Sequence, residues 1–168
     1  MKSKISKSPI ISVIGLGYVG LPLALKLSEY YPVTGYDIDK TRVKELQNGV
    51  DRTNEITSVE LFKAKYKLST NFSDTINSNI YIVTVPTPID KNNEPDLSFL
   101  LLASAYIGKA LSLGDIIIFE STVYPGVTEN VCGPALEKAS SLKSGQDFYL
   151  GYSPERINPG DKIHTVDK

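Results

Sequence analysis

Short apolar runs that suit buried strands recur along the chain, between longer segments with helical periodicity. Residues 10–14, 33–36 and 80–85 are rich in β-branched or aromatic residues and carry no charge, as is typical of strands that are buried on both faces of a sheet. Two further apolar runs and one weaker run, at residues 66–70, complete the set of candidate strands. We therefore predict strands at residues 10–14, 33–36, 66–70, 80–85, 115–121 and 147–153.

The segments between these runs predict helices at residues 21–27, 41–48, 59–66, 97–111 and 128–140. Pro22 falls in the first turn of the first helix, where its missing N–H matters little. Asp96 can cap the fourth helix. Strand and helix therefore alternate, which implies parallel strands joined by right-handed crossovers. The predicted fold class is α/β, a doubly wound, Rossmann-like parallel sheet with helices on both faces and strand order 3-2-1-4-5-6.

A glycine motif, Gly15-x-Gly17-x-x-Gly20, lies between the first strand and the first helix. In such a motif Gly15 allows the tight turn, Gly17 lets the backbone approach a pyrophosphate, and Gly20 lets the helix pack close to the strand. The helix N-terminus adds N–H groups and a partial positive charge. The motif therefore predicts a dinucleotide-binding site.

An acidic residue, Asp37, ends the second strand 20 residues after Gly17. Its carboxylate is placed to accept hydrogen bonds from the hydroxyls of an adenosine ribose. Asp37 and Asp39 would repel a 2′-phosphate, and we take Arg42 as the only nearby cation. NAD is therefore favoured over NADP as the cofactor, and the glycine turn alone leaves FAD open.

Length, charge and cysteine usage exclude several classes. The 168 residues suit one domain with a single sizeable core. A net charge of −1 gives no reason to expect nucleic acid or an anionic membrane as a partner. One cysteine, Cys132, and one histidine, His164, argue against a disulfide framework and a metal site. We expect Cys132 to be a small buried hydrophobe and the protein to be cytoplasmic.

The N-terminal segment has the outline of an export signal, with lysines before a run that starts at residue 10 and carries no charge before Lys26. The glycines of the motif and Pro22 interrupt that run where a signal helix should be continuous, and the run is short for a membrane span. We therefore expect residues 1–9 to be a disordered basic lead-in and residues 10–168 to be the folded domain.

Five motifs resemble those of the UDP-glucose/GDP-mannose dehydrogenases and occur in the same order: "VIGLGYVGLPLA", "GYDID", "VPTPID", "ESTVYPGVTE" and "GYSPERINPGD". The resemblance runs from about residue 10 to residue 161. It is strongest to the bacterial UDP-N-acetylhexosamine 6-dehydrogenases. Glucose-specific members have an aromatic residue and a second glutamate where this chain has Arg156 and Pro159.

The resemblance implies that the protein is part of an enzyme that oxidises the C6 alcohol of a UDP-N-acetylhexosamine or UDP-hexose to the uronic acid with two NAD+. Such enzymes supply capsule and O-antigen synthesis. A central helix that mediates dimerisation, and a C-terminal nucleotide-sugar domain with the catalytic cysteine, complete the family's architecture. We therefore expect this chain to be the NAD-binding domain of a homodimeric enzyme and to bind NAD without turnover.

The resemblance also assigns roles to individual residues. The residues that it assigns to the cofactor are Gly15, Gly17, Tyr18, Val19, Gly20, Asp37, Arg42, Pro86, Thr87 and Thr122. Among them, Asp37 and Arg42 hold the adenosine ribose; alternatively, Arg42 is a solvated helix residue paired with Glu45 or Asp39. The residues assigned to catalysis are Thr122 and Glu155, and those assigned to substrate are Glu155, Arg156 and Asn158.

Glu155 has the clearest chemical role among these residues. The resemblance implies that the catalytic cysteine forms a thioester with the substrate, and hydrolysis of that thioester needs a water that a carboxylate activates. Two other functions stay open. A module that senses NAD(H) without catalysis would need the glycine turn and Asp37, but no hydrolytic carboxylate. A β-hydroxyacid dehydrogenase has a similar turn, but the "SPERINPGD" segment speaks against it.

Overall fold

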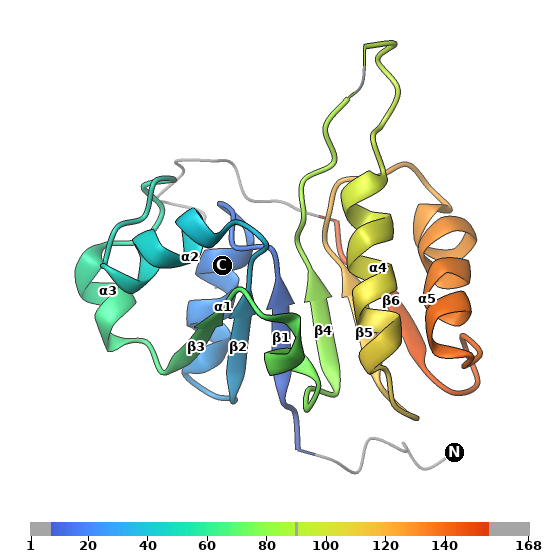
Figure 1. The fold of residues 1–168 in the computed structure, drawn as a ribbon, viewed down its shortest axis with the longest axis horizontal. Coiled ribbons are helices and arrows are strands. Elements are labelled where there is room, and N and C mark those ends of the chain that lie inside the picture. Colours follow the sequence, from blue (N-terminus) through green and yellow to red (C-terminus); the bar gives the residue numbers. More distant parts are fainter. Residues whose placement is uncertain (1–7, 90, 155–168) are drawn as a thin grey trace.

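Six strands in one parallel sheet form the centre of the computed structural model, which describes residues 8–89 and 91–154 (Figure 1). The strands are β1 (Ile11–Ile14), β2 (Val33–Tyr36), β3 (Tyr66–Ser69), β4 (Ile80–Val83), β5 (Ile116–Phe119) and β6 (Tyr149–Tyr152). Their order is β3-β2-β1-β4-β5-β6, and every pairing is parallel. The predicted fold class and strand order are therefore confirmed.

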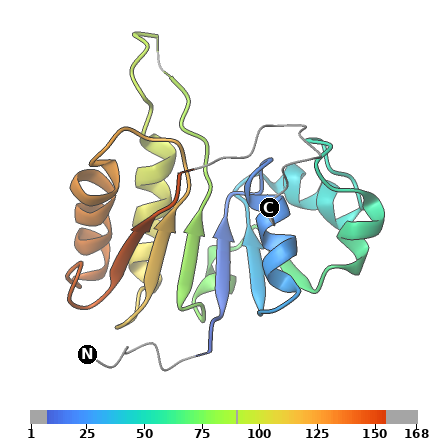
Figure 2. The same cartoon turned by 180° about the vertical axis from the view of Figure 1, so that it is seen from behind.

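Helices cover both faces of the sheet, as predicted (Figures 1 and 2). The helices are α1 (Gly20–Ser28), α2 (Lys40–Gln47), α3 (Ser58–Lys63), α4 (Ser98–Ala110) and α5 (Gly133–Ser140). The first three pack on one face, and α4 and α5 pack on the other, with the 3-10 turn η1 (Phe72–Thr75) beside them. All crossovers between parallel strands are expected to be right-handed. Because β2 and β3 lie on one side of β1 and β4 to β6 lie on the other, the connecting helices fall on opposite faces of the sheet.

Two local features differ from the sequence-based prediction. The 3-10 turn η1 was not predicted, because four residues with one large apolar side chain, Phe72, show no helical period. The helix predicted over residues 128–140 instead begins as the π-helical turn η2 (Thr128–Cys132) and continues as α5. Pro134 accounts for the change, because it has no N–H for an α-helical bond and its ring would clash with the carbonyl four residues before it.

Side chains alternate across the strands and build one apolar layer on each side of the sheet. In β1, Ile11 and Val13 join the layer beneath α1, α2 and α3, whereas Ile14 joins the layer beneath α4 and α5. The second layer contains Tyr81, Phe119, Phe148 and Cys132. Cys132 is 1% exposed, which confirms the expectation that it is a small buried hydrophobe.

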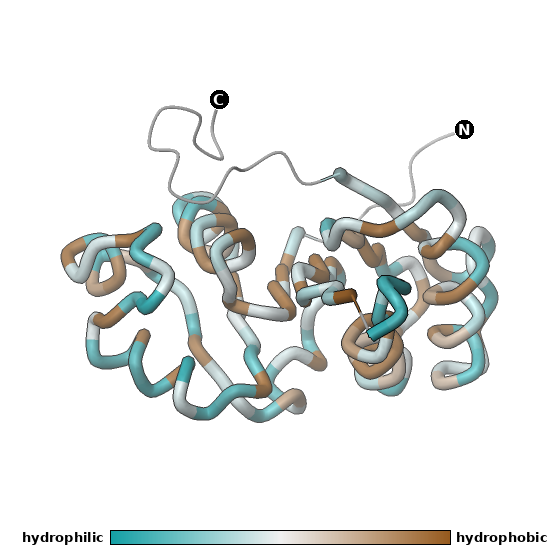
Figure 3. The backbone as a smooth tube through the Cα atoms, turned by 90° about the horizontal axis from the view of Figure 1, so that it is seen from above, coloured by the Kyte–Doolittle hydropathy of each residue, from teal (hydrophilic) through white to brown (hydrophobic). Residues whose placement is uncertain are grey.

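A long connection between β4 and α4 rises from the sheet as a narrow arm (Figure 1). The Asp96 N–H donates to the Pro88 carbonyl at 2.7 Å, and Ile89 and Pro95 form an antiparallel bridge. Seen from above, the tip of the arm is hydrophilic (Figure 3). At its base, the Asp96 carboxylate accepts a hydrogen bond from the Ser98 N–H at 2.9 Å, so Asp96 supports the start of α4, although Leu97 and not Asp96 is the N-cap residue.

The parallel arrangement brings the carboxyl ends of all strands to one edge of the sheet, where the order switches between β1 and β4. Ligands of open α/β sheets bind outside such a switch point. No helix in residues 8–89 and 91–154 is both long and apolar enough to cross a membrane, and no group of acidic, histidine or cysteine side chains in this part could hold a metal. Glu155, Arg156 and Asn158, and most of the predicted lead-in, lie outside the described residues.

Candidate functional site

The glycine turn connects β1 to α1 and packs directly on the end of β4. Gly15 has φ +98°, a conformation that glycine adopts without strain. Its carbonyl accepts a hydrogen bond from Thr84 Oγ1 at 2.8 Å. A Cβ on Gly20 would lie 2.0 Å from the Gly15 carbonyl oxygen and 2.3 Å from Thr84 Oγ1. Gly20 therefore permits the close approach of helix and strand for which the motif predicts a glycine.

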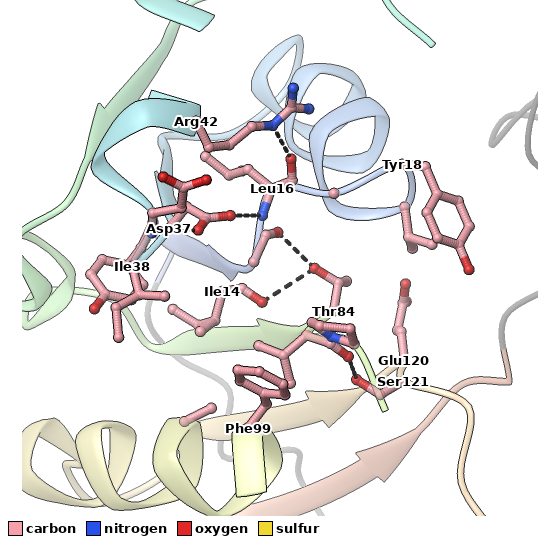
Figure 4. A pocket seen from close by; sticks show the side chains of 18 of the residues that line it. Ile14, Leu16, Tyr18, Asp37, Ile38, Arg42, Thr84, Phe99, Glu120 and Ser121 are labelled. Atoms are coloured by element: carbon pink, nitrogen blue, oxygen red, sulfur yellow. Dashed lines mark hydrogen bonds between the residues drawn. The ribbon is translucent and has the colours of Figure 1, made fainter. Parts of the chain in front are cut away.

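The backbone of Leu16, inside the turn, is held by two side chains (Figure 4). The Leu16 N–H donates to Asp37 Oδ2 at 2.8 Å, and the Leu16 carbonyl accepts from Arg42 Nε at 2.7 Å. The second Asp37 oxygen accepts from the Asp39 N–H at 2.9 Å. The Asp37 carboxylate therefore joins the turn to the end of β2, and each oxygen keeps a lone pair for a further donor.

Arg42 is a buried residue with a buried acidic partner. Its Nη2 lies 2.8 Å from Asp51 Oδ1, and the two side chains are 5% and 0% exposed. Nη1 is buried without a hydrogen-bond partner among the described residues. The alternative of a solvated Arg42 paired with Glu45 or Asp39 is therefore wrong, because Arg52 makes both of those contacts. The ribose contact of Arg42 stays a prediction.

Asp51 anchors the loop that follows α2. Its carboxylate accepts hydrogen bonds from the Thr53 N–H and hydroxyl and from the N–H groups of Glu55 and Ile56. Burial favours the neutral acid, but the hydrogen bonds from Thr53, Arg42 and Ile56 outweigh it and hold the pKa of Asp51 below its ordinary value. A continuous set of contacts thus leads from this loop through Arg42 to the glycine turn.

A cavity of about 380 Å³ lies along this edge of the sheet. The sequence-predicted cofactor residues that line it are Gly15, Gly17, Tyr18, Val19, Asp37, Arg42, Pro86, Thr87 and Thr122. Gly20 instead lies behind the turn, against Gly15 and Thr84. A Cβ on Gly17 would have no atom within 4 Å, so this glycine leaves open space on the side of the turn that faces the cavity.

The loops after β4 and β5 are joined at the far side of the cavity. Thr87 Oγ1 donates to the Thr122 carbonyl at 2.7 Å, and Ser121 Oγ donates to the Val85 carbonyl at 2.6 Å. Thr122 itself is exposed. The structure therefore brings the two predicted threonines together, at the opposite end from Asp37. Glu120 reaches into the cavity from the same side, toward Tyr18 (Figure 4).

Sequence reasoning missed the apolar wall of the cavity. Phe99, Leu102 and Tyr106 line it from α4, and Phe72 stacks on Tyr106 with ring centroids 5.4 Å apart. The rings of Phe72 and Tyr36 meet in a T-shaped arrangement with centroids 5.2 Å apart. The spacing of the α4 residues did indicate one helix face, but a helix face facing a ligand has the same period as one facing the core. The glycine motif likewise gave no signal for Thr84.

The residues present fit a dinucleotide. A turn with free space at Gly17 and a following helix N-terminus can receive a diphosphate, and a carboxylate with spare lone pairs lies at one end. The apolar wall gives a flat base a surface to lie on. One expectation needs correction: Arg42 is not the only nearby cation, because Arg52 also lines the cavity.

Comparison with known proteins gives consistent matches. Residues 10–168 match the sequence model of the NAD-binding domain of the UDP-glucose/GDP-mannose dehydrogenase family. Over 157 residues the chain is 52% identical to "Protein CapL" of Staphylococcus aureus, covering 94% of this chain and 37% of that protein. It is 53% identical over 157 residues to the UDP-N-acetyl-D-glucosamine 6-dehydrogenase of Pseudomonas aeruginosa, covering 93% and 37%. The chain thus spans little more than a third of the length of these relatives.

A solved structure shows the same architecture. The UDP-D-ManNAc dehydrogenase of Pyrococcus horikoshii superposes with a TM-score of 0.82 at 37% sequence identity, and the match covers 89% of this chain and 37% of that one. The family model covers the glycine turn and the strand ends that surround the cavity, and the structural match covers most of the chain.

Proposed function

Because the chain belongs to the UDP-glucose/GDP-mannose dehydrogenase family, as its NAD-binding domain, we propose that it serves an enzyme that oxidises C6 of a UDP-N-acetylhexosamine to the uronic acid. A UDP-hexose is the alternative substrate. The observation that carries the proposal is the single cavity in which the glycine turn, Asp37 and the threonines after β4 and β5 meet. The relatives' names support the acetylated sugar.

The chain's own residues divide the work of holding the cofactor. The turn at Gly17 presents backbone N–H groups and the positive end of α1 to the diphosphate. Asp37 accepts from the ribose hydroxyls through its spare lone pairs, and the unpartnered Nη1 of Arg42 offers a donor beside them. Pro86, Thr87 and Thr122 border the opposite end of the cavity. NAD+ supplies the hydride acceptor when it is bound.

The hydrolytic step is assigned to Thr122 and Glu155. Thr122 is exposed at the end of the β5 loop, and its carbonyl is fixed by Thr87. Glu155 follows β6 in sequence and is proposed to orient and deprotonate a water, with Arg156 and Asn158 as donors to the sugar. Both remaining alternatives, a sensor of NAD(H) and a β-hydroxyacid dehydrogenase, lack a use for this carboxylate.

The rest of the proposal concerns the complete enzyme. A nucleotide-sugar domain with a cysteine nucleophile completes the site, a central helix joins two subunits, and the product supplies capsule or O-antigen synthesis. The enzyme acts in the cytoplasm, where a buried free thiol such as Cys132 stays reduced, and needs no nucleic acid or membrane partner. The isolated chain binds NAD without turnover.

The substrate is tested by assaying the complete gene product with UDP-GlcNAc, UDP-GalNAc, UDP-ManNAc and UDP-glucose while NADH absorbance is followed. We expect one or two acetylated sugars to give kcat/KM at least about tenfold above that of UDP-glucose, the size of effect expected from one well-placed polar contact. Preference for UDP-glucose would contradict the assignment to the acetylated branch. Absence of NADH with every sugar would contradict the proposed activity.

Glu155→Gln tests the proposed carboxylate in the same complete protein. Loss of a general base lowers turnover by about 10²–10⁴-fold, so we expect uronate formation to fall by at least about 100-fold with little change in NAD+ affinity. Glu137→Gln, on α5, where the carboxylate is paired with Lys143 and does not line the cavity, is the matched control. Equal rates for the two variants would remove Glu155 from the mechanism.

A further inference from the structure

Arg52 lines the same end of the cavity as Asp37, and its charge is taken up by two carboxylates. Its Nη1 lies 3.1 Å from Asp39 Oδ2, and its Nε lies 2.5 Å from Glu45 Oε2. The Arg52 side chain is 43% exposed. Exposed ion pairs of this kind contribute little to stability, so the guanidinium can exchange one anionic partner for another at small cost.

Asp39 also occupies the N-terminus of α2. Its Oδ1 accepts from the Thr41 N–H at 2.8 Å, while its own N–H donates to Asp37 Oδ1. The backbone N–H of Arg42 first, and then the Thr41 N–H and Arg52, hold the pKa of Asp39 below its ordinary value. The Asp39 carboxylate therefore stays ionised in a place where a helix N-terminus and a guanidinium converge.

We propose that Asp39 and Arg52 are specificity-determining residues that reject NADP, because the Asp39 carboxylate occupies the donors that a 2′-phosphate on the adenosine ribose would need. A phosphate bound at a helix N-terminus beside an arginine is a common arrangement. Here the Asp39 carboxylate itself contacts the N-terminus of α2 and Arg52. A 2′-phosphate would therefore face two carboxylates, Asp37 and Asp39. The inference rests on the proposed binding of NAD at Asp37.

Among residues 8–89 and 91–154, Arg52 and Arg42 are the cations that line the cavity, and of these two Arg52 is the one that can serve a phosphate. The Arg42 guanidinium is buried, with Nε on the Leu16 carbonyl and Nη2 on Asp51. To turn toward a phosphate it would have to abandon a buried acid, which is strongly unfavourable. Arg52 would give up only partly exposed contacts with Asp39 and Glu45.

The test compares NADP+ and NAD+ binding by calorimetry in Asp39→Ser and in Asp39→Ser/Arg52→Gln. Serine caps a helix about as well as aspartate, and the substitution releases Arg52 Nη1 from Asp39 while the contact of Arg52 with Glu45 remains. We expect the ratio of the NADP+ Kd to the NAD+ Kd to fall at least about tenfold in Asp39→Ser. In the double variant this ratio should return most of the way to that of the unaltered chain. Asp39→Asn, which also removes the charge, should change the ratio in the same direction.

Asp96→Ser is the matched control, because Asp96 accepts a hydrogen bond from the N–H two residues later at the start of α4 but does not line the cavity. In this variant the ratio of the NADP+ Kd to the NAD+ Kd should equal that of the unaltered chain. The proposal would be overturned if the ratio were unchanged in Asp39→Ser and Asp39→Asn. It would also be overturned if the ratio fell equally in Asp39→Ser and in Asp39→Ser/Arg52→Gln. Failure of the unaltered chain to bind NAD+ would instead contradict the proposed function, so the two failures are distinguishable.

Discussion

Gly17→Val should weaken NAD+ binding by at least about 100-fold, equivalent to about 2.7 kcal/mol, and leave the fold intact. A Cβ at this position has no atom within 4 Å, so the added side chain has open space next to the turn, and we expect it to compete with the diphosphate for that space. Calorimetry with NAD+ measures the loss, and the thermal midpoint and circular dichroism measure the fold.

Gly20→Val provides the contrast within the same motif. Its Cβ would lie 2.0 Å from the Gly15 carbonyl oxygen, and overpacking against backbone lowers the free energy of unfolding by about 1–3 kcal/mol or more. We therefore expect this variant to lose stability as well as binding. If Gly17→Val bound NAD+ as tightly as the unaltered chain, the cavity beside the turn would not be the diphosphate site.

Asp51→Asn should lower the free energy of unfolding by about 3–5 kcal/mol. Removing one partner of a buried ion pair leaves the other charge uncompensated, and Arg42 would keep its charge in a buried position. For a domain of this size the change corresponds to a fall of roughly 6–20 °C in the thermal midpoint. Denaturant unfolding followed by circular dichroism measures the difference.

Asp96→Asn is the matched control for Asp51→Asn, because it makes the same chemical change at a helix start where asparagine caps about as well as aspartate. We expect its stability to change by less than about 0.5 kcal/mol. Equal destabilisation by the two substitutions would show that the Arg42–Asp51 contact does not brace the turn.

The effect of Asp51→Asn should depend on pH in a defined direction. The pKa of Asp51 is lowered in the folded protein, so its stabilising contribution is present above the ordinary carboxyl pKa of about 4 and is lost as the pH falls through the lower folded value. The stability difference between the two proteins should therefore be constant from about pH 5 to 7 and shrink below about pH 4. A difference that grew on acidification would contradict the depressed pKa.

Much of the fold was predictable because strand and helix periods are local signals. Short apolar runs gave all six strands, although β3 and β6 contain no β-branched residue, and β2 agrees at both ends. Pro134 was visible in the sequence, but the π-helical turn that precedes α5 was not predicted. That turn depends on backbone geometry, which the spacing of hydrophobic residues does not reveal. The boundaries of α1 and α4 differ from the prediction by one residue at each end, because the end of a helix depends on local backbone geometry that the hydrophobic period does not report.

The site was predictable where a single residue type carries the chemistry. The glycines and Asp37 were predictable for this reason. Close approach of the backbone to a diphosphate demands glycine, and recognition of the ribose hydroxyls demands an acidic residue. Arg42 did not, because an arginine on a polar helix gives the same sequence signal whether it is solvated or buried against Asp51. Arg52 was missed because contacts with Asp39 and Glu45, which lie 13 and 7 residues away in the sequence, hold its side chain beside the cavity.

Titration of the chain with NAD+ in a calorimeter tests the central claim most directly. The geometry predicts saturable heat with one site per chain, and displacement by ADP-ribose, which keeps the diphosphate and both riboses but has no nicotinamide. Folded protein that gives no heat at millimolar NAD+ would contradict the assignment of the cavity at Gly17 and Asp37 as the dinucleotide site.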